Sequence, residues 1–121
     1  MFSTLLKAKL HAARVTDSQL DYEGSLTIDQ DLMDYVQILP YEKILVADME
    51  NGNRFETYAI PGKRGSGAIC LNGATAHLGA VGDRLTIFTF GLVETAGAAQ
   101  HRPRVIRLDE KNRPIGGLLD V

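Results

Sequence analysis

Short apolar runs, alternating or continuous, follow one another along the chain and are separated by turns that contain glycine. The first run covers residues 2–12, where the side chains alternate with period two, as in a strand with one face in the core. The pattern places Phe2, Thr4, Leu6, Ala8, Leu10 and Ala12 on that face, and Ser3, Leu5, Lys7, Lys9 and His11 on the other. Lys9 and His11 therefore project from the same side of the strand.

The next segment, residues 20–28, is predicted to be extended, with a turn-like interruption at the Glu-Gly-Ser tripeptide of 23–25. Asp29 follows and is a suitable N-cap for a short helix over about 29–36. Pro40 comes shortly afterwards and prevents the helix from continuing.

A hairpin is predicted in the middle of the chain. Residues 43–49 form a continuous apolar run that is typical of a buried strand, and the Asn-Gly pair at 51–52 is a strong hairpin signal. The return strand covers 54–60 and ends at a Pro-Gly pair. Alternation places Arg54, Glu56, Tyr58 and Ile60 on one face of it, and Phe55, Thr57 and Ala59 on the other.

The rest of the chain is divided into short elements. They are a loop at 62–67, a strand at 68–71, a short helix at 74–79, a buried strand at 84–93, a turn or helical piece at 95–103 and a last strand at 104–108. In total the pattern predicts six or seven short strands and two short helices, which alternate too closely for βαβ units. A small closed or nearly closed β-barrel is the expected architecture, because closure removes exposed strand edges.

Composition narrows the class of protein. The 121 residues are predicted to form a single domain, and 45% of them are hydrophobic, as in globular proteins. Thirteen basic and 15 acidic side chains give a net charge of −2, which argues against nucleic-acid binding. No apolar run approaches the roughly 20 residues of a membrane helix. Cys70 is the only cysteine and is interpreted as a small core residue, and the absence of any disulfide favours the cytoplasm.

Few groups of residues indicate chemistry by their spacing alone. The GKRGSG loop at 62–67 lacks the Lys-Ser/Thr pair of a phosphate-binding loop, and the histidines lack metal-ligand spacing. Lys9, His11, Arg54 and Tyr58 would form a cationic pocket for a small dicarboxylate if their strands are neighbours or meet across a subunit boundary. Surface charges on a half-exposed sheet explain the same four residues.

Several motifs in order resemble one family. They are KAKLHAARVT at 7–16, YEGS at 22–25 followed by IDQDLMD at 28–34, NGNRFETYAI at 51–60 and GSGAICLNGATAHLGAVGD at 65–83. Together they resemble the aspartate 1-decarboxylase family over residues 1–93. The resemblance implies a double-psi β-barrel and a homotetramer with active sites between adjacent subunits. It also implies pyruvoyl-dependent decarboxylation of L-aspartate to β-alanine and CO₂, a step that feeds pantothenate and coenzyme A synthesis.

The resemblance further implies that the chain cuts itself between Gly24 and Ser25. The Ser25 hydroxyl attacks the Gly24 carbonyl to give an ester, and β-elimination then divides the chain into a β-chain, 1–24, and an α-chain, 25–121. Ser25 becomes the covalently bound pyruvoyl group. Such a rearrangement needs a strained peptide and a stabilised oxyanion. By the same likeness Thr57 donates a hydrogen bond to the Gly24 carbonyl.

Roles in turnover are also implied by the resemblance. The pyruvoyl ketone forms a Schiff base with the substrate amine and serves as the electron sink. Arg54 binds a substrate carboxylate and Tyr58 returns a proton to the α-carbon. The other substrate contacts implied are Lys9 for a second carboxylate, His11, Tyr22, Thr57 and Asn72 for shape and hydrogen bonding, and the backbone of Gly73, Ala74 and Thr75.

The chain departs from the family pattern at two positions. Thr75 stands where alanine is common, so its hydroxyl contacts or crowds the substrate, and Ala47 stands where some members carry an aromatic residue. Two other functions stay open: a non-enzymatic barrel that binds a small anion through Lys9 and Arg54, and a structural subunit. The sequence also leaves open whether cleavage is spontaneous or needs an accessory maturation protein, as it does in some members.

Overall fold

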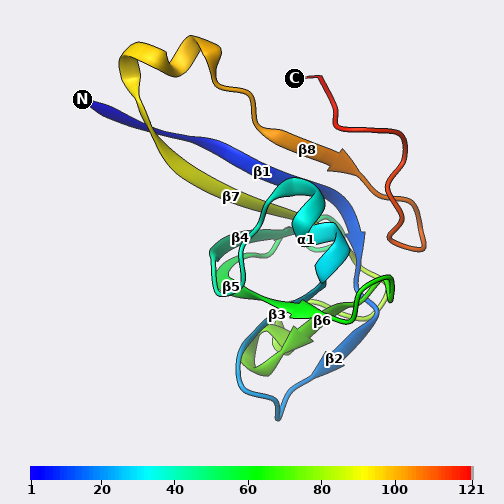
Figure 1. Cartoon of the computed structure of the whole chain (residues 1–121). Coiled ribbons are helices and arrows are strands. Elements are labelled where there is room, and N and C mark those ends of the chain that lie inside the picture. Colours follow the sequence, from blue (N-terminus) through cyan, green and yellow to red (C-terminus); the bar gives the residue numbers. More distant parts are fainter. Residues whose placement is uncertain (121) are drawn as a thin grey trace.

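Eight strands form one sheet in the computed structural model, which describes residues 1–120 (Figure 1). Their order across the sheet is β2-β6-β3-β5-β4-β7-β1-β8. The strands are β1 (Phe2–Arg14), β2 (Asp17–Gln19), β3 (Ser25–Asp29), β4 (Lys43–Asp48), β5 (Arg54–Gly62), β6 (Ile69–Asn72), β7 (Arg84–Glu94) and β8 (Arg104–Arg107). The helices are α1 (Gln30–Val36) and two 3₁₀ turns, η1 (Gly73–His77) and η2 (Thr95–Gln100).

The pairing of these strands combines both directions. β1 with β7, β7 with β4, β4 with β5 and β3 with β6 are antiparallel, whereas β3 with β5, β2 with β6 and β1 with β8 are parallel. Parallel neighbours need crossover connections, so the sheet curls around its own core instead of forming a simple meander. The expected mainly β domain with short helices is confirmed, and the arrangement agrees with a double-psi β-barrel.

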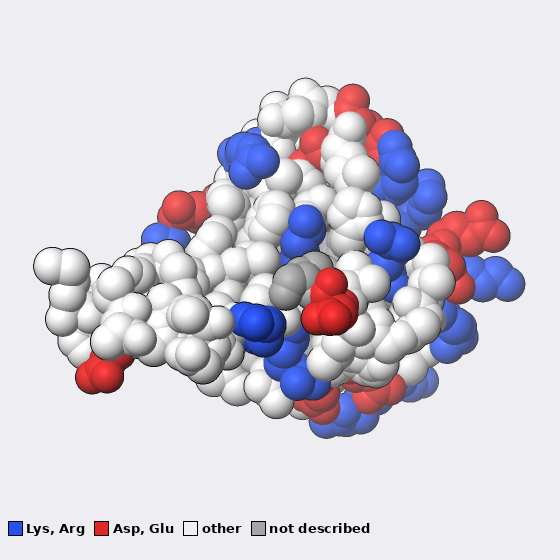
Figure 2. All heavy atoms as spheres, turned by 90° about the horizontal axis from the view of Figure 1, so that it is seen from above, with Lys and Arg blue, Asp and Glu red and all other residues white. Residues whose placement is uncertain are grey.

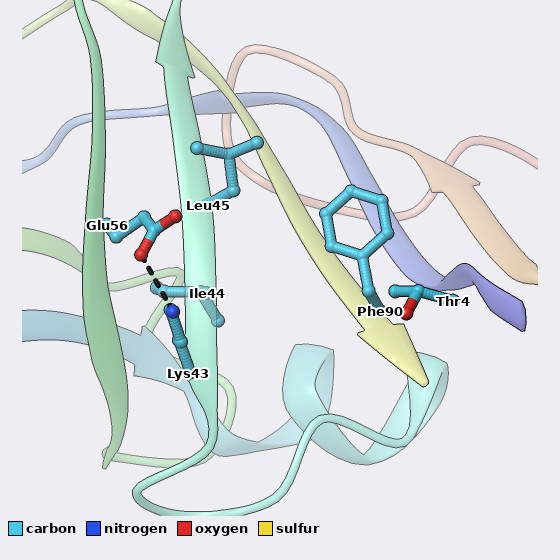
Figure 3. A pocket seen from close by; sticks show the side chains of 6 residues that line it. All are labelled: Thr4, Lys43, Ile44, Leu45, Glu56 and Phe90. Carbon is cyan, nitrogen blue, oxygen red and sulfur yellow. Dashed lines mark ion pairs between the residues drawn. The ribbon is translucent and has the colours of Figure 1, made fainter. Parts of the chain in front are cut away.

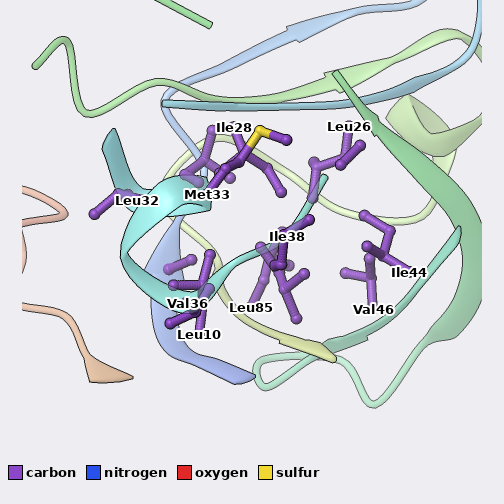
Figure 4. Packing of buried hydrophobic residues seen from close by; sticks show 14 of the residues in the cluster. Leu10, Leu26, Ile28, Leu32, Met33, Val36, Ile38, Ile44, Val46 and Leu85 are labelled. Carbon is purple, nitrogen blue, oxygen red and sulfur yellow. The ribbon is translucent and has the colours of Figure 1, made fainter. Parts of the chain in front are cut away.

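The core lies inside the curl of the sheet, where α1 covers it (Figure 4). Its largest fully buried side chains include Leu10, Leu26, Ile28, Met33, Ile38, Ile44, Ile69, Leu71, Leu85, Ile87 and Ile106. They come from six strands, from α1 and from the segment that follows it. Leu26 and Ile28 bring β3 into this core, so the strand that begins at Ser25 is held firmly by apolar packing.

Asp29 stabilises two segments with one carboxylate. It caps α1 as predicted, accepting a hydrogen bond from the Asp31 amide at 2.8 Å. It also accepts hydrogen bonds from the amides of Gly65 at 3.1 Å and Gly67 at 2.8 Å. The glycine-rich loop at 62–67 therefore packs against the start of the helix through this carboxylate, which supports the interpretation that it does not bind phosphate.

The predicted face of β1 is correct for Ala8 and Leu10 but wrong beyond them. Ala12 has a positive φ of 65° and the pairing with β7 shifts, so Ala13 takes the next buried position. Such a bulge reverses the alternation. At the other end Phe2 is 62% exposed, because this part of β1 pairs only with the end of β7 in a ribbon that projects from the body (Figure 1).

Other predicted boundaries move by a few residues. The segment 20–28 is not one extended stretch, since residues 20–24 form a turn region between β2 and β3. The helix expected at 74–79 is the 3₁₀ turn η1, and it begins at Gly73. Among residues 1–120 no helix has the length and apolar character needed to cross a membrane.

Candidate active site

Ser25 begins β3 and is almost completely buried, with 1% of its surface exposed. β3 lies between β5 and β6, and Ser25 is the partner of Asn72 in the antiparallel register with β6. The φ of Ser25 is 121°, a value that residues with a side chain rarely adopt. A strained φ of this kind costs on the order of 1–3 kcal/mol and persists only where surrounding structure imposes it. The backbone strain therefore lies next to the Gly24–Ser25 peptide bond.

Asn72 provides the polar surroundings of the Ser25 hydroxyl. Its amide nitrogen Nδ2 donates to Ser25 Oγ at 3.2 Å and to Thr27 Oγ1 at 2.8 Å. Its carbonyl oxygen Oδ1 accepts from Cys70 Sγ at 3.1 Å. The bonds of Asn72 to Ser25 and Cys70 are buried, so they restrict these side chains more strongly than bonds exposed to solvent would.

The carbonyl of Gly24 points toward β5. Its oxygen accepts a hydrogen bond from the phenol of Tyr58, with 3.2 Å between the two oxygens. The hydroxyl that reaches this carbonyl is therefore that of Tyr58 and not that of Thr57, the residue expected from the sequence. Thr57 lies on the opposite, half-buried face of β5, as the alternation predicted. An O–H donor at the carbonyl is placed to stabilise negative charge on that oxygen.

Gly73 allows the first residues of η1 to approach the segment that precedes Ser25. It has a φ of +62°, and a Cβ at this position would lie 2.9 Å from Gly24 Cα, 2.9 Å from the Tyr22 carbonyl oxygen and 3.0 Å from the Gly24 nitrogen. The two separations of 2.9 Å are shorter than real Cβ contacts, and both involve backbone atoms, so an added Cβ would force the backbone to shift. The backbone of η1 thus holds residues 22–24 from one side while Tyr58 contacts them from another.

Thr75 uses its hydroxyl inside the turn. The Oγ1 atom donates to the Asn72 carbonyl oxygen at 2.7 Å, and the side chain is buried. The departure from alanine at this position therefore adds a hydrogen bond that fixes the step from β6 into η1. Ala74, between Gly73 and Thr75, is exposed.

Lys9, Arg54 and Tyr58 lie on one outer face of the sheet. Residues directly opposite each other in neighbouring strands share a face. Lys9 is opposite Phe88, Phe88 is opposite Leu45, and Leu45 is opposite Glu56, which is on the same side of β5 as Arg54 and Tyr58. β7 and β4 therefore separate Lys9 from Arg54 within one chain. The four predicted pocket residues share a face, but one chain does not bring them all together.

The charges on this face affect His11. Burial lowers the pKa of His11, and the positive charges of Lys9, Arg107 and Arg84 lower it further. Lys9 itself lies over the ring of Phe88, with Nζ 5.5 Å from the ring centroid. At neutral pH His11 is therefore uncharged, and the positive charge around it comes from Lys9, Arg107 and Arg84.

A hollow of about 270 Å³ lies on the same outer face (Figure 3). It is lined by Thr4, Lys43, Ile44, Leu45, Glu56 and Phe90. Lys43 and Glu56 pair at 2.8 Å across its rim, and Phe90 borders it from β7 (Figure 3). None of the residues expected to bind substrate lines this hollow, and Ser25 does not open into it.

Comparison with known proteins gives a consistent result. A family model described as aspartate decarboxylase matches residues 1–115. A protein of Leptospira biflexa named aspartate 1-decarboxylase is 53% identical, over 94% of this chain and 98% of that protein. A protein of the same name from Heliobacterium modesticaldum is 56% identical, over 90% of this chain and 83% of that protein. Another, from Syntrophobacter fumaroxidans, is 54% identical, over 92% of this chain and 90% of that protein.

The chain belongs to the aspartate decarboxylase family. The sequence did not indicate that Cys70 and Thr27 belong to the surroundings of the Gly24–Ser25 bond in this family member. Both contact the Asn72 amide, which itself contacts Ser25. The i, i+2 spacing of Cys70 and Asn72 on one strand was a signal that they share a face, but the pairing with β3 was not predictable from it.

Proposed function

We propose that this chain decarboxylates L-aspartate to β-alanine and CO₂ in the cytoplasm, as a step toward pantothenate. We further propose that it makes its own pyruvoyl group by cleavage between Gly24 and Ser25. The names of its relatives support the reaction. The observation that carries the self-cleavage is the strained backbone of a buried serine whose hydroxyl and preceding carbonyl both have hydrogen-bond donors.

The proposed cleavage follows from these contacts. Ser25 Oγ attacks the Gly24 carbonyl carbon, the C–N bond breaks, and an ester and a free amine replace the amide. Tyr58 donates to the carbonyl oxygen while it carries negative charge. Loss of the Ser25 α-proton then breaks the Cβ–Oγ bond, so that Gly24 leaves as a carboxylate. Water then hydrolyses the remaining dehydroalanine. Its nitrogen leaves as ammonia, and the pyruvoyl ketone remains.

The strain at Ser25 favours the first step. An amide is more stable than the corresponding ester, so the rearrangement is uphill in a relaxed chain. A positive φ at residue 25 raises the free energy of the intact peptide by on the order of 1–3 kcal/mol. Breaking that peptide releases the strain, which offsets part of the cost of forming the ester.

The residues around position 25 fit a pyruvoyl group, because Asn72 and Tyr58 supply donors for its oxygens. When present, that group supplies an electron sink for the carbanion left by CO₂. Arg54 would bind a carboxylate of the substrate, since a guanidinium pairs with carboxylate through two parallel hydrogen bonds. Tyr58 is close enough to the cleavage site to return a proton at the α-carbon.

The remaining part of the proposal requires a second copy of the chain. Lys9 lies two strands away from β4 and three from β5, so it joins Arg54 at a substrate only across a subunit boundary. The projecting ribbon of β1 and β7 offers a surface for such a contact, as it exposes Phe2, Phe90 and Leu92. Figure 2 shows few charged side chains on this projection. We therefore propose a homotetramer with active sites between subunits.

The mass of the purified chain under denaturing conditions tests this proposal. We expect two fragments from a cut after Gly24, and the larger fragment should carry the serine-to-pyruvoyl mass change. The protein should also release CO₂ from L-aspartate. The Ser25→Ala variant should stay whole and inactive. Ser66→Ala is the matched control, because Ser66 also follows a glycine, Gly65, but is exposed.

Two outcomes would contradict the proposal. A Ser25→Ala chain that still released CO₂ from aspartate would show that the chemistry does not depend on this serine. A wild-type chain that stays whole, binds aspartate and never turns it over would instead favour the anion-binding barrel. Adding an extract of the source cell to whole chain tests the accessory maturation protein, since division would then begin only after the addition.

A further inference from the structure

The orientation of the Asn72 amide decides what the Ser25 hydroxyl meets. With Nδ2 toward β3, the amide donates to Ser25 Oγ and Thr27 Oγ1. Both of these partners are hydroxyls, which donate as readily as they accept. They would therefore accommodate the flipped amide as well, with Oδ1 facing them, and cannot fix the orientation by themselves.

Cys70 favours one of the two orientations, because its S–H can donate to Oδ1 whereas its sulfur accepts an N–H from a flipped amide only weakly. It lies two residues before Asn72 on β6, so the two side chains share a face, and its Sγ is 3.1 Å from Asn72 Oδ1. Burial raises the pKa of the Cys70 thiol, and the charge of Asp17, its partner in the register of β2 with β6, raises it further. The sulfur therefore keeps its hydrogen at neutral pH and can donate to a carbonyl oxygen.

We propose that Cys70 is a positioning residue for self-cleavage, whose S–H group holds the Asn72 amide with its N–H groups toward Ser25 Oγ. This inference rests on the function proposed above. It adds a residue that acts through Asn72 and touches neither the breaking peptide bond nor the substrate.

The orientation of the Asn72 amide affects the elimination step of the proposed cleavage. When the Cβ–Oγ bond of residue 25 breaks, Oγ becomes an oxygen of the departing Gly24 carboxylate and takes the electron pair of that bond. An N–H of Asn72 pointing at Oγ stabilises the developing negative charge. In the flipped amide the carbonyl oxygen would face the same atom and repel it. Loss of the Cys70 donor should therefore slow elimination more than the attack that forms the ester.

Three substitutions at position 70 separate hydrogen bonding from packing. Cys70→Ser keeps a donor, Cys70→Ala removes it, and Cys70→Val removes it while filling the space. The masses present in a freshly purified sample of the whole chain, measured over time, give the rate at which the chain divides. We expect the alanine and valine variants to divide at least roughly fivefold more slowly than wild type, the effect of losing one hydrogen bond, and the serine variant to divide faster than both because it keeps a donor.

A second readout identifies the step. Hydroxylamine cuts an ester but not an amide, so it releases residues 1–24 from any chain in which the ester has formed. The Cys70→Ala and Cys70→Val chains should accumulate more of this hydroxylamine-sensitive form than wild type or Cys70→Ser. A purely structural role would lower the melting temperature and would leave the ester fraction unchanged.

The outcomes are separable from those of the proposed function. A wild-type chain that divides while Cys70→Ala and Cys70→Val divide equally fast overturns this inference alone. So does an order of rates in which valine matches wild type and serine is slow, since packing would then explain the effect. A wild-type chain that does not divide even after the source-cell extract is added overturns the proposed function and this inference with it.

Discussion

The phenol of Tyr58 donates a hydrogen bond to the carbonyl oxygen of Gly24, with 3.2 Å between the two oxygens. This contact crosses from β5 to the turn ahead of β3, two segments 34 residues apart in the sequence. A tyrosine expected to act on the substrate therefore also touches the peptide bond that is proposed to break. One side chain would serve the maturation of the chain first and turnover afterwards.

Replacing Tyr58 by phenylalanine should slow self-cleavage on the order of a hundredfold, because the oxyanion on Gly24 loses its O–H donor. The mass of whole and divided chain over time measures the rate. Tyr41→Phe is the matched control: Tyr41 is 76% exposed, and its ring centroid is 6.5 Å from that of Tyr58. Equal division rates for the two variants would remove Tyr58 from the maturation step.

Replacing Gly73 by alanine should displace residues 22–24 and impair division. The added Cβ would meet Gly24 Cα at 2.9 Å, and alanine also resists the φ of +62°. We expect a loss of about 1–3 kcal/mol in the free energy of unfolding and a clear fall in the division rate. Gly52→Ala separates the two causes, since Gly52 has a φ of +78° and no atom lies within 4 Å of the place that an added Cβ would take. It should lose stability but divide normally.

Stability should fall as pH rises through the titration of Asp48. Burial, the largest cause, and the nearby Asp83 together raise the pKa of Asp48 from 3.8 to about 6, in opposition to the Glu50 amide that donates to Asp48 Oδ1. Because the folded pKa is the higher one, the contribution to stability is fully present below about pH 4 and is lost as pH rises through about 6.

Replacing Asp48 by asparagine removes this titration while keeping an oxygen for the Glu50 amide. Relative to wild type, D48N should gain on the order of 2 kcal/mol of unfolding free energy between about pH 4 and about pH 7. Urea unfolding across this range measures the difference. A constant difference between the two proteins at every pH would show that Asp48 keeps an ordinary pKa in the folded chain.

Replacing Arg54 by methionine should raise the KM for L-aspartate by roughly tenfold or more, because a charged hydrogen-bond pair with the substrate is lost. Arg54 makes no hydrogen bond to residues 22–25 in the described part of the chain, so division should proceed at the wild-type rate. Steady-state kinetics on fully divided protein measures KM and kcat. Lys43→Met is the control, since Lys43 is a cation on the neighbouring strand that pairs with Glu56. Equal KM values for both variants would contradict the assignment.

Local signals predicted the elements that local chemistry controls. The Asp29 cap, the Asn-Gly hairpin at 51–52 and the alternation of β5 all depend on residues close in the sequence, and all are present in the fold. The bulge at Ala12 was not predictable, because the shift in pairing between β1 and β7 forces its positive φ. Alanine carries no sequence signal for that conformation.

The candidate site was predictable only in part for the same reason. The resemblance indicated Ser25 and Asn72, but their contact depends on the antiparallel register of β3 and β6, which are separated by two other strands in the sequence. The donor to the Gly24 carbonyl was expected to be Thr57, and the adjacent Tyr58 reaches it instead because it lies on the other face of β5. Which of two neighbouring hydroxyls faces a distant carbonyl is set by tertiary packing.

The position of Ser25 at the start of the third strand has a consequence for how the molecule is assembled. Division there would leave β1 and β2 on a separate peptide, although β1 pairs with β7 along most of its length and with β8 on its other side. The intact chain brings these strands together by first-order folding. Once divided and then unfolded, two peptides would have to meet in solution, so recovery would depend on concentration. Heat damage to the mature protein would then be far harder to reverse than damage to its precursor.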